Sequence, residues 1–131
     1  MRKILLLIPV VAASLPGLQN ARAQQSDVTR VDLQRHDLSS AGREAIQVRV
    51  DFAVGAAADR HRHPGEEIIY VLAGKLEYQL ADAAPTTLKA GDVLFVPAGV
   101  VHRARNVGDG PASELATYIV EKGKPLVTRA P

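Results

Sequence analysis

The chain has 131 residues and a formal net charge of +2, and 47% of its residues are hydrophobic. This length suits one domain. The sequence contains no cysteine, which excludes disulfides, thiolate metal sites, thiol nucleophiles and iron–sulfur clusters. Charges of both signs are interspersed without a basic run, so the composition does not favour nucleic acid or an anionic membrane surface as a partner.

The first 23 residues are predicted to be a signal peptide. Arg2 and Lys3 precede an apolar run of 15 residues, 4–18, and Ala21-Arg22-Ala23 matches the small-x-small pattern of a signal-peptidase site. A retained membrane anchor is the alternative, but the run is shorter than the ~20 residues of a membrane span and is interrupted by proline. We therefore expect cleavage before Gln24, export to the periplasm or the medium, and no membrane contact afterwards.

Removal of this segment changes the charge balance. Residues 24–131 contain 13 Lys and Arg side chains against 14 Asp and Glu, a net charge of −1. An exported domain of this size without disulfides must be held together by its core, by a metal or by a partner subunit.

The mature chain is predicted to consist of short β-strands. Residues 24–42 form a polar lead-in with a short edge strand at 30–38. From Glu44 to Ala53 apolar and polar residues alternate, which is the pattern of a half-buried strand. Further strands are expected at 60–63, 67–72, 76–80, 86–88, 93–96, 102–107 and 114–120, separated by turns such as Pro64-Gly65.

No segment has the apolar period of an amphipathic helix. The strand pattern therefore predicts an all-β sandwich or barrel in a single domain, 43–121. A loosely held C-terminal tail, 122–131, follows it.

Three of the four histidines belong to a potential metal site. His61 and His63 are two residues apart, which on a strand places both imidazoles on one face. Glu67 follows after the Pro-Gly turn, and His102 comes from a distant hairpin. Three imidazoles and one carboxylate suit a divalent first-row metal with open positions for water or substrate.

The two stretches that contain these residues resemble the signature motifs of the cupins. Residues 55–74 match G-x5-H-x-H-x3-E-x6-G, and residues 91–106 match G-x5-P-x-G-x2-H-x3-N, both without a gap. The fixed positions are Gly55, His61, His63, Glu67, Gly74, Gly91, Pro97, Gly99, His102 and Asn106.

The resemblance implies a jelly-roll β-barrel that holds Fe, Mn, Ni, Cu or Zn inside. Its ligands would be His61, His63, Glu67 and His102, and Glu67 is also the candidate catalytic residue. A homodimer is expected from the family and from the small size of the domain. The implied function is a dioxygenase-type, quercetinase-like oxidoreductase acting on a small molecule. The alternatives are a non-catalytic module that binds a metal or small ligand, and a protein whose metal only stabilises the fold.

The remaining conspicuous residues have structural interpretations. Gly55, Gly74, Gly91 and Gly99 are expected in turns with positive φ, and Asn106 in a structural hydrogen bond. Glu66 is expected to be exposed or close behind the ligands, and His36 to lie on the surface. Core packing is expected for the aromatic residues Tyr70, Tyr78, Phe95 and Tyr118. The direction of Gln47, Arg49 and Gln79, inward or outward, stays open.

Overall fold

The computed structural model describes residues 27–131. The predicted signal peptide, 1–23, and the start of the lead-in lie outside these residues. Within 27–131 the chain forms strands and no helix, and hence no helix that is long and apolar enough to cross a membrane. The strands are β1 (Val28–Asp37), β2 (Arg43–Phe52), β3 (Ala57–Arg62), β4 (Gly65–Ala73), β5 (Lys75–Leu80), β6 (Thr86–Lys89), β7 (Val93–Val96), β8 (His102–Asn106), β9 (Ala112–Glu121) and β10 (Thr128–Arg129).

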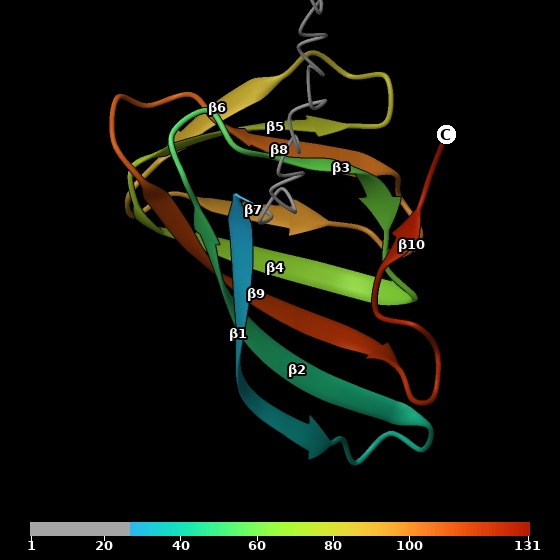
Figure 1. Ribbon diagram of the computed structural model, residues 1–131. Helices are drawn as coiled ribbons and strands as arrows, with labels where there is room; N and C mark the ends of the chain where they lie inside the picture. Colours follow the sequence, from blue (N-terminus) through green and yellow to red (C-terminus); the bar gives the residue numbers. More distant parts are fainter. Residues whose placement is uncertain (1–26) are drawn as a thin grey trace, which may run out of the picture.

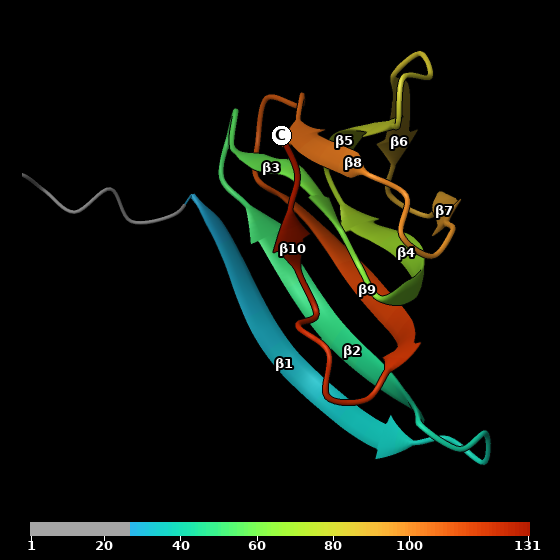
Figure 2. The ribbon, with the colours of Figure 1, turned by 90° about the vertical axis from the view of Figure 1, so that its right-hand side faces the viewer.

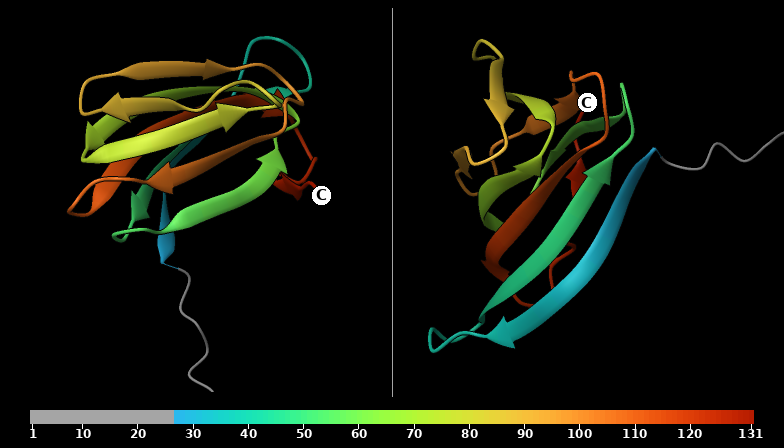
Figure 3. Two further views of the ribbon diagram at one scale, coloured as in Figure 1. Left: turned by 90° about the horizontal axis from the view of Figure 1, so that it is seen from above. Right: turned by 90° about the vertical axis from the view of Figure 1, so that its left-hand side faces the viewer.

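The strands form two antiparallel sheets that face each other, as Figure 1 shows and Figure 3 repeats from two other directions. Sheet A has the order β1-β2-β9-β4-β7, and sheet B has the order β10-β3-β8-β5-β6. Strands that are neighbours in a sheet are often distant in the chain, such as β2 and β9, which is the crossed connectivity of a jelly roll. The predicted all-β jelly roll is confirmed.

The core lies between the two sheets and follows from the alternation in β2 and β9. Every second residue of β2, from Glu44 to Phe52, is buried, and β9 alternates in the same way from Ala112 to Val120. Because side chains of a strand point to opposite faces in turn, one face of sheet A covers the core and the other faces outward. The largest fully buried apolar side chains are Tyr118, Phe52, Ile69, Leu76, Val48, Val71, Val96 and Val120.

Both ends of the described chain are more ordered than the sequence predicted. Val28 already belongs to β1, which pairs with β2, so the edge strand predicted at 30–38 begins two residues earlier than expected. In the tail, β10 pairs with β3 next to Arg62 and His61. Figure 2 shows β10, near the C-terminus, next to β3. The prediction of a loosely held tail is therefore wrong at this point.

Glycine fills two roles in the fold. The four motif glycines all have φ between 71° and 93°, as expected for turn residues. Gly65 has a different role, because β4 already begins there and a Cβ would lie 2.0 Å from the carbonyl oxygen of Ile119. Close packing of β4 on β9, and not only a turn, therefore explains the glycine that follows Pro64.

The outer side of sheet A carries a contiguous apolar face, formed by Ile68, Tyr70, Leu72, Val93 and Phe95. All five side chains are between 42% and 65% exposed. Ile68 is directly opposite Phe95, and Tyr70 is opposite Val93, so these four residues form two adjoining cross-strand pairs. Core packing is thus wrong for Tyr70 and Phe95, whereas Tyr78 and Tyr118 are buried.

This outer apolar face predicts where the expected homodimer forms. Its five side chains form a contiguous exposed apolar surface, and such surfaces often mark interaction sites on soluble proteins. We expect Phe95→Glu combined with Ile68→Lys to shift the protein from dimer to monomer in size-exclusion chromatography with light scattering. Val54→Lys, at an exposed residue outside the face, is the control and should stay dimeric. A wild-type monomer at all concentrations would contradict this prediction.

Candidate metal centre

Sheet B and the turn that follows β3 bring the three histidines together. His61 on β3 and His102 on β8 are direct cross-strand partners, and their ring centroids are 4.3 Å apart. His63 follows the end of β3, and its ring centroid is 4.9 Å from that of His61 and 5.1 Å from that of His102. One potential ligand atom from each of the three lies within 4.8 Å of the others.

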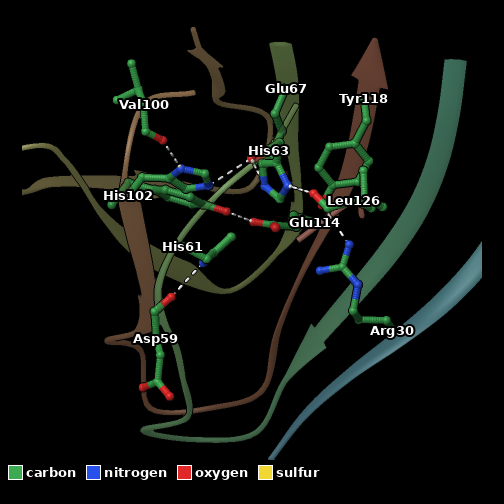
Figure 4. Close-up of polar contacts among 11 residues, drawn as sticks. Arg30, Asp59, His61, His63, Glu67, Val100, His102, Glu114, Tyr118 and Leu126 are labelled. Atoms are coloured by element: carbon green, nitrogen blue, oxygen red, sulfur yellow. Dashed lines mark hydrogen bonds and ion pairs between the residues drawn. The ribbon is translucent and has the colours of Figure 1, made fainter. Parts of the chain in front are cut away.

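Glu67 approaches this cluster from sheet A. It lies on β4 between Val96 of β7 and Tyr118 of β9, both buried, so its side chain points into the sandwich. Its Oε2 is 3.0 Å from Nε2 of His102 and 3.2 Å from Nε2 of His63. Glu67 therefore contacts two of the three histidines between the sheets, as Figure 4 shows, whereas the group of ligand atoms that all lie within 4.8 Å of one another consists of the three histidines without Glu67.

A backbone carbonyl fixes the orientation of each imidazole. In all three histidines Nδ1 is in contact with a carbonyl oxygen, and a carbonyl only accepts, so Nδ1 carries the hydrogen. Each Nε2 is then left with its lone pair, the form in which imidazole binds a metal. The pairs are His61 with Asp59 at 2.6 Å, His63 with Leu126 at 2.7 Å, and His102 with Val100 at 3.0 Å.

The donor atoms fit a divalent metal. Nε2 of His63 and Oε2 of Glu67 are buried, and neither makes a hydrogen bond of acceptable geometry although they are 3.2 Å apart. Two ligands at right angles around a metal at 2.0–2.2 Å lie about 3 Å from each other. Two orphaned buried atoms at this spacing are hence accounted for if both bind one cation.

The electrostatics keep Glu67 ionised and His61 neutral. Burial alone would raise the pKa of Glu67, but the imidazoles of His102 and His63 lower it to about 2. Burial lowers the pKa of His61 to about 4. For His102 burial acts in the same direction, but the contact with Glu67 outweighs it and raises the pKa. Without a metal, a proton on His102 is the natural counter-charge of the carboxylate.

The cluster is most open beside His61. His63, Glu67 and His102 are 2–3% exposed, whereas His61 is half-buried. A pocket of about 340 Å³ adjoins His61 and contains none of the other three residues. Another pocket, of about 230 Å³, lies around Arg103 and Arg105 and contains none of the four. A hollow beside His102 has no room for a water molecule, so the wider access to the centre is on the His61 side.

A second buried polar group was missed by the sequence analysis. Glu114 on β9 is 3% exposed, and the hydroxyl of Tyr78 from sheet B donates a hydrogen bond to it. Burial raises the pKa of Glu114 to about 8. The signal was its parity, because Glu114 alternates in register with the core residues Ala116 and Tyr118.

Arg30 on β1 also contributes to this region. Its Nη2 donates a hydrogen bond of 2.8 Å to the hydroxyl of Tyr118, and its guanidinium carbon is 5.7 Å from the centroid of that ring. The Tyr118 ring is in turn 4.7 Å from the ring of His63. A chain of contacts therefore links β1 to the histidine cluster (Figure 4).

The other predicted residues lie outside the cluster. Glu66 points outward and is paired with Arg43 at 2.6 Å, and His36 is exposed. Asn106 has the expected structural role, since its amide nitrogen donates to the carbonyl oxygens of Phe52, Ala53 and Gly110. The side chains left open face away from the core: Gln47 bonds to Thr117, Arg49 to Asp51, and Gln79 to the carbonyl of Ala83.

Two facing sheets with a histidine cluster between them define a jelly-roll protein with a candidate metal centre. Residues 48–118, more than half of the chain, match the cupin domain family. The chain therefore belongs to the cupin family, as its two motifs predicted.

Known relatives agree with this assignment. The chain is 39% identical over 75 residues to germin-like protein subfamily 2 member 2 of Arabidopsis thaliana, which covers 53% of this chain and 34% of that protein. It thus spans about a third of the length of this relative.

Two solved structures show the same fold. A double-stranded β-helix protein from Klebsiella pneumoniae has a TM-score of 0.66 at 23% identity, over 82% of this chain and 90% of that one. Oxalate oxidase in complex with glycolate has a TM-score of 0.65 at 22% identity, over 82% and 57%.

The ligand set can be tested by metal content. We expect His61→Ala combined with His102→Ala to reduce bound metal from about one ion per chain to nearly none, because two of the converging Nε2 atoms are removed. Elemental analysis of the purified, dialysed protein measures this. His36→Ala, at the exposed histidine, should retain full metal content. Undiminished metal in the double variant would refute the site.

Glu114 predicts a pH dependence of stability in the metal-free protein. Its folded pKa of about 8 is above the ordinary 4.5, so its contribution is full below pH 4.5 and is lost as the pH rises toward 8. Glu114→Gln keeps an acceptor for Tyr78 but cannot ionise. As the pH rises through this range, we expect the free energy of unfolding of the variant, measured with urea, to increase by a few kcal/mol relative to that of the wild type. Each unit of pKa shift corresponds to ~1.4 kcal/mol. A difference that does not change with pH would contradict this, and Glu66→Gln controls for the loss of one carboxyl.

Proposed function

We propose that the protein is a metal-dependent oxidoreductase that binds one divalent transition metal through His61, His63, His102 and Glu67 and oxidises a small molecule with dioxygen. The observation that carries this proposal is the cluster of three histidines, two of which contact the carboxylate of Glu67, beside a pocket that adjoins His61. The structural likeness to oxalate oxidase supports an oxidase or dioxygenase reaction.

The residues of the chain would prepare the centre in three ways. Carbonyl groups hold each imidazole in the tautomer that presents Nε2. The buried walls exclude water except on the His61 side. The metal, when bound, would supply Lewis acidity and a place where substrate and dioxygen meet.

Glu67 is better suited to ligation than to proton transfer. A pKa of about 2 leaves it ionised at neutral pH but makes it a weak base, and a nearby cation would weaken it further. The second carboxyl, Glu114, holds a proton near neutral pH because of its raised pKa. We therefore assign Glu67 the role of a ligand in place of the catalytic base expected from the sequence.

The pocket favours a small polar substrate over a flavonol. Its volume of about 340 Å³ is at the lower end of ligand pockets, which span about 300–1,000 Å³. Its walls contain two arginines and an aspartate. A quercetinase-like reaction therefore remains one form of the proposal, and oxidation of a smaller substrate is better supported.

The second candidate is a non-catalytic module that binds a small ligand at the metal. The charged and open pocket beside His61 favours it, because such an opening suits reversible binding as well as turnover.

Oxygen uptake separates the two candidates. The protein would be loaded separately with Fe, Mn, Ni, Cu and Zn and assayed with phenols, diketones and small hydroxy acids. We expect one redox-active metal to support oxygen consumption with at least one substrate, and the His61→Ala/His102→Ala variant to show none. A metal-loaded protein that binds a ligand of this panel without consuming oxygen would refute the enzyme and support the binding module.

A further inference from the structure

The pocket beside His61 has two arginines that no motif accounts for. Its walls are formed by Val28, Arg30, Ala57, Ala58, Asp59, His61, Val127 and Arg129. Arg30 comes from β1 of sheet A, and Arg129 comes from β10 of sheet B. The two guanidinium groups therefore reach the same pocket from opposite sheets.

The strand register explains why both side chains face inward. Arg129 is the direct cross-strand partner of His61, and directly opposed residues project from the same face of a sheet. Arg30 is opposite Val50, which is 2% exposed and belongs to the core. Both arginines hence occupy inward-facing positions at the rim of the sandwich, where they line the pocket that adjoins His61.

These arginines retain unused hydrogen-bond donors. Within residues 27–131 neither forms an ion pair with a carboxylate. Arg30 donates one hydrogen bond to the hydroxyl of Tyr118, and this bond fixes the position of the Arg30 side chain. A guanidinium has five donors, so the others remain available. Asp59 is the only acidic residue in the pocket wall, so positive charge is in excess there.

We infer that this pocket binds a small carboxylate, whose oxygens are held by Arg30 and Arg129 while the rest of the molecule lies against His61. The planar fork of arginine matches a carboxylate through two parallel hydrogen bonds. If the centre is an enzyme as proposed above, this carboxylate is its substrate. The binding of the carboxylate does not itself depend on that proposed function. The arginines act as positioning residues, since they touch the anchor and not the metal.

The test uses malonate and its neutral counterpart malonamide, which have the same shape and differ in charge. Isothermal titration calorimetry is performed on the protein in both its metal-loaded and its chelator-treated form. We expect malonate to bind to both forms, and malonamide to bind at least tenfold more weakly, because a charge-assisted bond is worth ~1.5–3 kcal/mol.

Variants then assign the anchor. Arg129→Gln should weaken malonate binding about tenfold or more, and Arg129→Lys should weaken it less, since lysine keeps the charge but lacks the fork. The matched control is Arg103→Gln, an exposed arginine in the pocket on the outer face of sheet B, which should change the affinity less than twofold. Unchanged metal content in each variant shows that the fold is intact.

Equal weakening by Arg129→Gln and Arg103→Gln would overturn the inference, because the effect would then be due to net charge. Equal affinity for malonate and malonamide, or no binding of either, would overturn it as well. Oxygen uptake with non-acidic substrates but no malonate binding would refute the carboxylate anchor alone. Malonate binding without any turnover would refute the enzyme alone.

Discussion

The contact between Glu67 and two imidazoles determines how this sandwich is built. The carboxylate projects from sheet A and the imidazole of His102 from sheet B, so one interaction joins both layers at the centre of the core. A buried carboxylate without compensating charge costs several kcal/mol, and the sheets can close only if cations or protons are supplied to it. We call the group formed by His61, His63, Glu67 and His102 the cage. A metal bound in the cage and a proton on His102 are two ways of compensating the charge of this carboxylate.

The cage depends equally on parts of the chain that bind nothing themselves. Each histidine is oriented by a backbone carbonyl: that of Asp59 in β3 for His61, that of Val100 in the turn before β8 for His102, and that of Leu126 in the C-terminal segment for His63. The wall behind the cluster is made of Tyr118, Arg30 and the Tyr78–Glu114 pair, which come from three different strands and from both sheets. The motif residues therefore define the donor atoms, and the flanking strands hold them in place.

The motifs predicted the family, the fold and the cluster of three histidines, because spacing along a strand directly determines which side chains share a face. The same reasoning placed the strands of the core within a few residues. It failed for β10 and for residues 28 and 29 at the start of β1, where short segments become strands through pairing with other parts of the chain. It also missed Glu114, since a carboxylate at a core position is stable only beside a hydroxyl donor that the sequence does not bring near. Tyr70 and Phe95 point outward because their neighbours Ile69, Val71 and Val96 occupy the inward positions of the same strands, a choice of face that hydrophobicity alone does not decide.

The hydrogen bond from His63 to the carbonyl of Leu126 closes a loop of 63 residues. Contacts between residues this far apart in the chain form slowly, because the chain loses the entropy of loop closure before the contact stabilises it. The cage, which needs β3, β4, β8 and the C-terminal segment at once, therefore belongs to the late stages of folding. If a metal binds at this site, we therefore expect it to bind to chains that have already folded, because its donors come together only then.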